Sequence, residues 1–267
     1  MLSKLITHEA KRIGRFLLPV FGALLILTAL TRVMEAVCLG WQGRAPLWLS
    51  IPTAFLLIGT LFCSIFLTAA SFGLPVLHFY RMLGQEGYLL FSIPATISQQ
   101  IWSKLLSACV WMIASLGVFF GCLWALVLQP FDMMEQIKLA MFSQLNQSWI
   151  VLFLIMLVFL FILTLVGNFL YAYSCCALGM QFGTNRLLAT LVLYFGIPVV
   201  LQIVALIGIV ITGAILAACG VFSTFATAQP ASLCVAFLGI VTIVTILWDV
   251  ICYKITLYLL SKRLNLV

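Results

Sequence analysis

The stretch IVLFLIMLVFLFILTLVGNFLYAY, Ile150 to Tyr173, decides the fold because it contains no charged residue. A bilayer core about 30 Å thick needs about 20 helical residues to cross it. An uncharged apolar run of this length predicts a membrane-spanning helix. Working outward, we find five more such runs, and the six predicted spans are residues 16–38, 48–77, 102–128, 148–174, 187–217 and 231–260.

The composition of the whole chain predicts an integral membrane protein. Of its 267 residues, 65% are hydrophobic and 7% are charged, and the mean hydropathy is +1.28. Such a chain cannot be a water-soluble globular domain, and no polar stretch is long enough to form a second core. The basic N-terminus followed by an apolar run is typical of a secretory signal, but no convincing cleavage site precedes Arg32, so we expect the helix to be retained. We predict one all-α transmembrane domain over residues 1–267.

The basic residues indicate the topology. Six spans place both termini on one side, and ten of the thirteen Lys and Arg residues lie near span ends on that side. The other side has three, Arg32, Arg44 and Lys138. The positive-inside rule therefore places both termini in the cytoplasm. The formal net charge is +7, but the basic residues are scattered rather than gathered in a patch, so we expect no nucleic-acid partner.

Residues 1–15 have the pattern of an amphipathic helix that lies on the membrane surface. Apolar side chains recur at helical spacing and predict one face, formed by Leu2, Leu5, Ile6, Ala10, Ile13, Phe16 and Leu17. Polar, mostly basic side chains predict the opposite face, formed by Lys4, His8, Lys11, Arg12 and Arg15. A merely solvated basic tail is the alternative, but the regularity of the apolar face favours the interfacial helix.

Residues 79–100, between the second and third runs, are unusually polar for this chain, and the topology places them in the cytoplasm. Gly84 and Gly87 weaken helix continuity, and Pro94 forces the residue before it out of helical geometry. The pattern T-x-x-Q from Thr96 predicts a capping box that opens the third span, with Lys104 near the lipid headgroups. A short cornered helix is therefore predicted, suited to docking on a soluble partner. Its candidate contact residues are Arg81, Gln85, Glu86, Gly87, Tyr88, Leu89 and Ser92.

The reactive groups that a membrane enzyme needs are scarce. The chain has six acids and two histidines, and His8-Glu9 is not followed by the second histidine of a zinc-protease HExxH motif. His78 has no acid or cysteine at ligand spacing and is interpreted as interfacial. The nine cysteines form no metal spacing and are expected to pack as small apolar groups, although a bond among Cys38, Cys122, Cys219 and Cys234 stays open. We expect no catalytic residue and no metal site.

A few polar residues lie within or at the ends of the spans. Asp249 is an acid inside a predicted span, either a functional group or a carboxylate that reaches interfacial water. Arg32 and Glu35 are one helical turn apart and could form an ion pair, with a substrate contact as the alternative. Asn168 and Gln202 are expected to form interhelical hydrogen bonds worth about 1 kcal/mol. Pro198 is expected to kink the fifth span because it lacks a backbone N–H.

The stretch FYRMLGQEGYLLFSIPATISQQIWSKLL, Phe79 to Leu106, resembles the region after the second span in permease subunits of Firmicutes-type ATP-binding cassette transporters, the type-2 exporter class. The matching residues are Glu86, Gly87, Tyr88, Leu89, Pro94, Ser103 and Lys104. Leu90 and Ala95 stand where that family often has threonine and valine. The resemblance implies that residues 79–100 and the helix of residues 1–15, through Lys4, Lys11, Arg12 and Arg15, contact a nucleotide-binding subunit.

The chain has no GxxxxGK[ST] motif, so ATP-driven work would require a separate ATPase that binds ATP and Mg²⁺. The resemblance therefore predicts a permease subunit in a bacterial cytoplasmic membrane, paired with a second permease and with ATPase subunits. Its nearly uncharged spans favour export of an amphipathic or hydrophobic compound or peptide. Two alternatives remain: an ion- or proton-coupled secondary transporter that uses Asp249, and a scaffold or sensor subunit that transports nothing.

Overall fold

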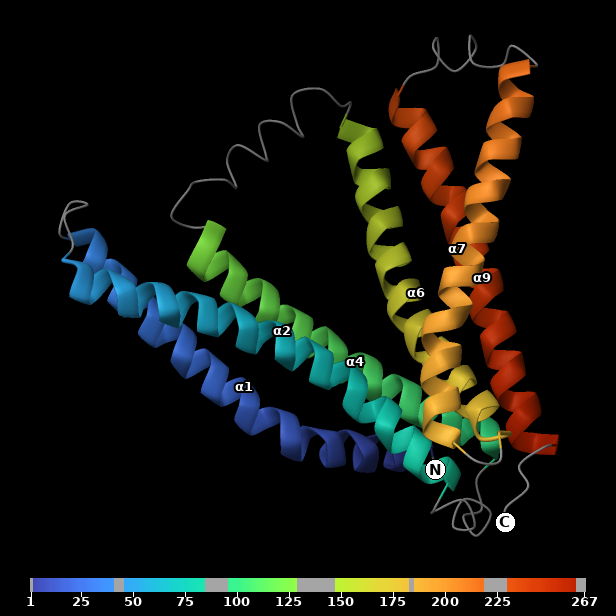
Figure 1. Ribbon diagram of the computed structural model, residues 1–267, viewed down its shortest axis with the longest axis horizontal. Helices are drawn as coiled ribbons and strands as arrows, with labels where there is room; N and C mark the ends of the chain where they lie inside the picture. Colours follow the sequence, from blue (N-terminus) through green and yellow to red (C-terminus); the bar gives the residue numbers. More distant parts are fainter. Residues whose placement is uncertain are drawn as a thin grey trace. The chain divides into compact units, whose positions relative to one another are not determined.

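A computed structural model describes residues 2–40, 46–84, 96–128, 147–182, 185–218 and 230–262, which are helical almost throughout and contain no strand. The helices are α1 (Leu2–Gly40), α2 (Leu47–Gly84), α4 (Ile97–Leu123) with the π-helical turn η1 (Trp124–Leu128), α6 (Gln147–Gly179), α7 (Arg186–Ala218) and α9 (Pro230–Lys262) (Figure 1).

Six helices in the described part of the chain are long and apolar enough to cross a membrane, which confirms the predicted all-α class and the six apolar spans. Their outer surfaces carry large apolar side chains, and Phe55, Phe66 and Leu47 are each more than 70% exposed. Contiguous apolar surface of this extent is unfavourable in water, so it is suited to contact with lipid. A multi-pass membrane protein therefore follows from both the sequence and the structure.

The chain divides into two compact units, described separately here. One contains Met1–His78 with Ser98–Ser143, and so α1, most of α2, α4 and η1. The other contains Phe79–Ile97 with Gln144–Val267, and so the last turns of α2 together with α6, α7 and α9.

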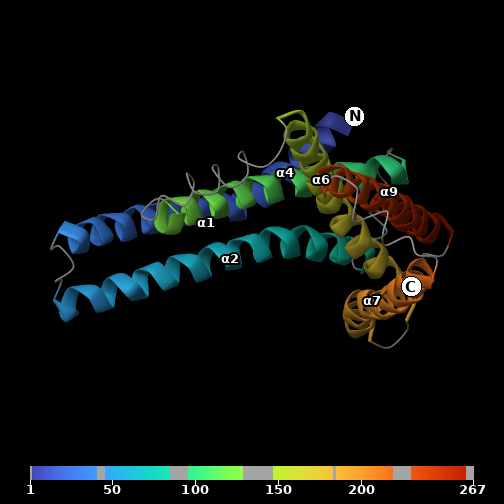
Figure 2. The ribbon, with the colours of Figure 1, turned by 90° about the horizontal axis from the view of Figure 1, so that it is seen from above.

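In the first unit, α1 packs closely against α4. The core contains Ile13, Leu17, Phe21, Leu24, Leu67 and Cys122. The Trp111 indole Nε1 donates a hydrogen bond to the Ala10 carbonyl at 2.9 Å, and the indole lies over Gly14, where a Cβ atom would overlap it. In the view of Figure 2, α1 and α4 run alongside one another, and α2 lies to one side of both. Glycine at position 14 therefore sets how closely the two helices approach.

The segment predicted to be an amphipathic helix, residues 1–15, is the first part of α1 rather than a separate helix. Helix α1 runs without a break over 39 residues, because apolar residues continue at helical spacing through Ile13 and Leu17 to Phe21. The predicted basic side chains are exposed: Lys4, His8, Lys11, Arg12 and Arg15. Phe16, on the predicted apolar face, is 66% exposed.

In the second unit, α6 packs against both α7 and α9. Its C-terminal half is buried, including Phe169, Tyr173 and Cys176. The ring of Phe79, from the last turns of α2, stacks on Tyr173 with 4.1 Å between the ring centroids. A Cβ atom at Gly179 would overlap Thr190, so α6 and α7 also approach closely near the turn that joins them. The buried half of α6 carries residues of the site described below, so its packing positions that site.

The polar segment between α2 and α4 is described only at its ends. Helix α2 ends at Gly84, one of the two glycines expected to weaken it, and α4 begins at Ile97, directly after the Thr96 that opens the predicted capping box. Arg81 is exposed in the last turn of α2. The remaining predicted contact residues lie outside the described residues: Gln85, Glu86, Gly87, Tyr88, Leu89 and Ser92.

Candidate functional site

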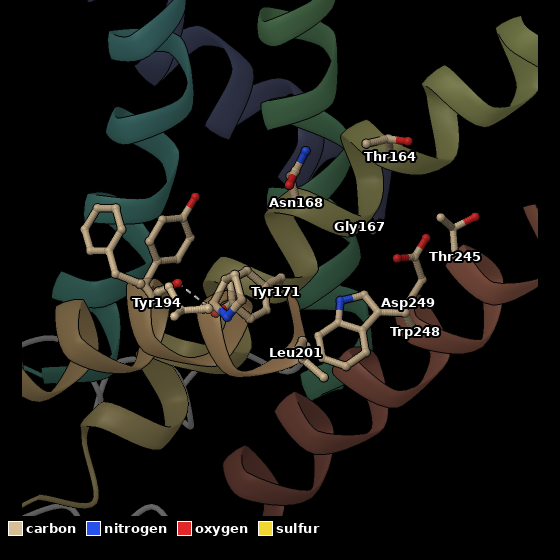
Figure 3. A pocket seen from close by; sticks show the side chains of 12 residues that line it. Thr164, Gly167, Asn168, Tyr171, Tyr194, Leu201, Thr245, Trp248 and Asp249 are labelled. Atoms are coloured by element: carbon tan, nitrogen blue, oxygen red, sulfur yellow. Dashed lines mark hydrogen bonds between the residues drawn. The ribbon is translucent and has the colours of Figure 1, made fainter. Parts of the chain in front are cut away.

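A cavity of about 560 Å³ lies between α6, α7 and α9 (Figure 3). This volume is within the range of small-molecule sites in proteins, about 300–1,000 Å³. The three helices contribute its lining residues, which are Thr164, Gly167, Asn168, Tyr171, Tyr194, Phe195, Pro198, Val199, Leu201, Thr245, Trp248 and Asp249. Each of these helices is long enough to cross a membrane, so the cavity belongs to the spanning part of the chain.

One wall of the cavity depends on Pro198. Proline has no N–H, so the carbonyl of Tyr194, four residues earlier, cannot receive its usual hydrogen bond within the helix. The Tyr171 hydroxyl on α6 donates to this carbonyl at 2.8 Å and lies 3.1 Å from the Leu193 carbonyl (Figure 3). Helix α7 continues through Pro198 without interruption. Tyr171 therefore replaces the missing donor and joins α6 to α7 at the cavity.

Asp249 places a carboxylate at the cavity from α9. Its Oδ1 atom lies directly against Gly167 of α6, where a Cβ atom would overlap it. Its Oδ2 atom is buried and, among the described residues, has no hydrogen-bond partner. An ionisable group without a partner inside a spanning segment costs several kcal/mol, so such groups usually serve a function. Gly167 is the residue that allows this carboxylate to fit between the helices.

Aromatic rings form much of the remaining lining. The ring centroid of Tyr171 is 5.4 Å from that of Tyr194 and 6.2 Å from that of Trp248. Phe195 packs edge-on against Tyr194 at 5.3 Å. The lining residues include no Lys, Arg or His, and the described part of the chain holds no group of three or more metal-ligating side chains. The cavity thus combines aromatic faces, neutral polar groups and one carboxylate.

The structure brings together two of the polar residues that the sequence singled out. Asn168 and Asp249, far apart in the sequence, both line the cavity. Gln202 follows the lining residue Leu201 but is exposed and does not line the cavity. Arg32 and Glu35 belong to the first unit, where they form the predicted ion pair with 2.9 Å between Nη1 and Oε2.

The aromatic residues of this site carry no functional signal in the sequence. Tyr171, Tyr194 and Trp248 lie in apolar runs and are typical of membrane-spanning helices. One signal was available, because the proline at position 198 implies an unpaired carbonyl four residues earlier that needs a donor from elsewhere. The sequence does not indicate which residue is this donor, because the donor lies on another helix.

A second polar cluster in the first unit was also missed. The Lys104 ammonium lies 2.7 Å from the Glu9 carboxylate, and the His78 Nε2 atom lies 3.8 Å from it. Lys104 is 9% exposed, although the sequence placed it at headgroup level. The sequence did contain a signal, because Glu9 lies between Ile6 and Ile13 on the apolar face of its helix. The cluster connects α1, α2 and α4 at one end of this unit.

The cysteines pack mainly as apolar groups, as expected. Among the described cysteines, those at 38, 63, 109, 122, 175, 176 and 252 are free, and most of them are buried. The Cys122 thiol lies 3.2 Å from the Thr28 hydroxyl. Cys219 lies outside the described residues.

No protein-family model, curated protein sequence or solved structure matches this chain. The functional interpretation therefore rests on the residues and their geometry.

Proposed function

We propose that the chain is the membrane-spanning subunit of a transporter and that the cavity between α6, α7 and α9 receives its cargo. One observation carries this proposal: a cavity of about 560 Å³ between three helices able to span a membrane contains a carboxylate, an amide and hydroxyl groups. Polar groups at such a place are costly to insert and mark substrate or ion pathways. A bundle with a purely structural role would fill this space with apolar side chains.

We further propose that the transporter is of the ATP-binding cassette exporter class and that this chain is its permease. The resemblance of residues 79–106 to that family supports this assignment, as does the lack of a P-loop motif in the sequence. The energy would then enter through separate ATPase subunits that bind ATP and Mg²⁺, and a second permease would complete the pathway. Both termini would be on the cytoplasmic side of a bacterial cell membrane.

In this mechanism, closure of the ATPase subunits displaces the segment that joins α2 to α4. The chain connects this segment to both helices, since α2 ends at Gly84 and α4 begins at Ile97. The Glu9, His78 and Lys104 cluster ties α1 to α2 and α4. The three helices would therefore move together and shift the permease between two states.

Co-purification tests the proposed class. The tagged chain, gently solubilised from its native membrane, is expected to retain an ATP-binding subunit, and Glu86→Lys is expected to release it. Glu35→Lys makes the same charge change on a residue that pairs with Arg32 and serves as the control. If no ATP-binding subunit accompanies the wild-type chain, the assignment to this class is wrong.

A second candidate function is a proton- or ion-coupled transporter, favoured by the carboxylate of Asp249 in the cavity. Transport in reconstituted vesicles separates the two functions. Flux that collapses with an ionophore, persists with vanadate and is abolished by Asp249→Asn supports the coupled transporter. Flux that requires ATP and stops with vanadate supports the ATP-binding cassette permease, and no flux under either condition supports a scaffold or sensor subunit.

A further inference from the structure

We propose that the cavity between α6, α7 and α9 binds an amphipathic organic cation, a molecule with one positive charge and an apolar body. The inference rests on the proposed transport function, because it names the class of cargo that the cavity would take. It is argued from the charge, the lining and the size of the cavity.

The charge of the cavity is uncompensated. The Asp249 Oδ2 atom is buried without a hydrogen-bond partner in the described structure, and the lining residues contribute no basic side chain. Lys254 is the basic residue that follows on α9, but five residues correspond to a rotation of roughly 140° around a helix, and Lys254 is exposed. A buried carboxylate is stabilised by an opposite charge nearby, and a bound cation would supply it.

The lining selects an organic rather than an inorganic cation. Calcium and magnesium require six or more oxygen ligands at fixed distances, whereas this cavity offers one carboxylate among aromatic rings. The rings of Tyr171, Tyr194 and Trp248 line the same cavity as Asp249 (Figure 3). Aromatic faces attract cations and also contact apolar groups, so they serve both parts of such a ligand.

The polar groups of the cavity argue against a lipid chain as the occupant. An acyl chain would contact the aromatic rings but would leave the Asp249 carboxylate without an opposite charge. An acyl chain would also offer no hydrogen bond to the Asn168 amide, which lines the cavity. The volume of about 560 Å³ accommodates a molecule of several rings, so a compact aromatic cation fits both requirements.

Equilibrium dialysis of the full chain in detergent against radiolabelled tetraphenylphosphonium tests the proposal. The wild-type chain is expected to bind this cation, and Asp249→Asn is expected to weaken binding about 30-fold or more, since a buried charge loses its partner. Glu35→Gln removes the same formal charge from the other unit and should leave binding unchanged. Tetraphenylborate, an anion of the same shape, should not lose affinity in Asp249→Asn.

A measurement on the wild-type chain covers the case in which Asp249→Asn does not fold. Dicyclohexylcarbodiimide modifies carboxyl groups in apolar surroundings, and mass spectrometry locates the product. Tetraphenylphosphonium is expected to slow modification of Asp249 and to leave that of Glu35 unchanged. Equal binding by the wild type and Asp249→Asn, or modification of Asp249 that the cation does not slow, would overturn the proposal. Retention of a phospholipid that tetraphenylphosphonium does not displace would also overturn it.

These measurements need no ATPase, so their failure differs from failure of the proposed function. If the cation binds but no ATP-binding subunit co-purifies, the cavity assignment stands and the transporter class is wrong. If an ATP-binding subunit co-purifies but Asp249→Asn binds the cation as well as the wild type does, only the cavity assignment is wrong.

Discussion

Removing the Tyr171 hydroxyl tests whether this group replaces the donor that Pro198 lacks. Tyr171→Phe keeps the ring but leaves the Tyr194 carbonyl without the hydrogen bond now measured at 2.8 Å. An unpaired buried acceptor costs about 1–3 kcal/mol, whereas interhelical hydrogen bonds in membrane proteins average about 0.6 kcal/mol and reach about 1.7. Because this carbonyl has no donor within its own helix, we expect a loss of about 1 kcal/mol in the free energy of unfolding.

A double-mutant cycle with Pro198→Ala separates this role from simple packing. Alanine restores an N–H that can bond the Tyr194 carbonyl, so in this background Tyr171→Phe should cost only a few tenths of a kcal/mol. Reversible unfolding by dodecyl sulfate in mixed micelles, followed by circular dichroism, gives all four free energies. If Tyr171→Phe costs the same with proline or alanine at position 198, the coupling energy is zero and the donor argument is wrong.

Two further perturbations test the packing of the first unit by the same unfolding assay. Glu9→Gln should lower the free energy of unfolding by about 3 kcal/mol, because it leaves the Lys104 ammonium buried without its partner at 2.7 Å. Adding Lys104→Met should recover most of this loss. If it recovers none, the two residues do not act as a buried pair. Gly14→Ala should destabilise by about 1–3 kcal/mol because its Cβ atom would overlap Trp111. Gly22→Ala on the same helix has open space and should stabilise by up to about 1 kcal/mol, so equal effects of the two alanines would refute the close approach.

The existence of the six helices was predictable because it depends on local composition. A run such as Ile150 to Tyr173 has no charge over the width of a bilayer, and no distant residue changes that. Local turn chemistry was informative as well, since Gly84 is the last residue of α2 and Thr96 directly precedes α4. Helix lengths were less predictable, because polar residues beyond the apolar run can continue a helix, as His78 to Gly84 do in α2.

The side-chain pairs across helices were not predictable, because they depend on the rotation and vertical position of each helix. The Glu9 and Lys104 pair joins residues 95 positions apart, and hydrophobic periodicity does not determine which turns of two helices meet. For the same reason, the hydrogen bond from Tyr171 to the Tyr194 carbonyl was not predictable. Asn168 and Asp249 were recognised as polar residues within spans, but the sequence did not indicate that they share one cavity.

The buried Glu9 and Lys104 pair also has a consequence for biosynthesis. The two residues are 95 positions apart, so a ribosome that adds about 5–20 residues per second makes Lys104 about 5–20 s after Glu9. During this interval the carboxylate has no ammonium partner, and α1 cannot complete its packing until α4 has emerged. In nascent chains that end before position 104, α1 should therefore be loosely packed. An insertase that shields Glu9 would protect such chains from degradation.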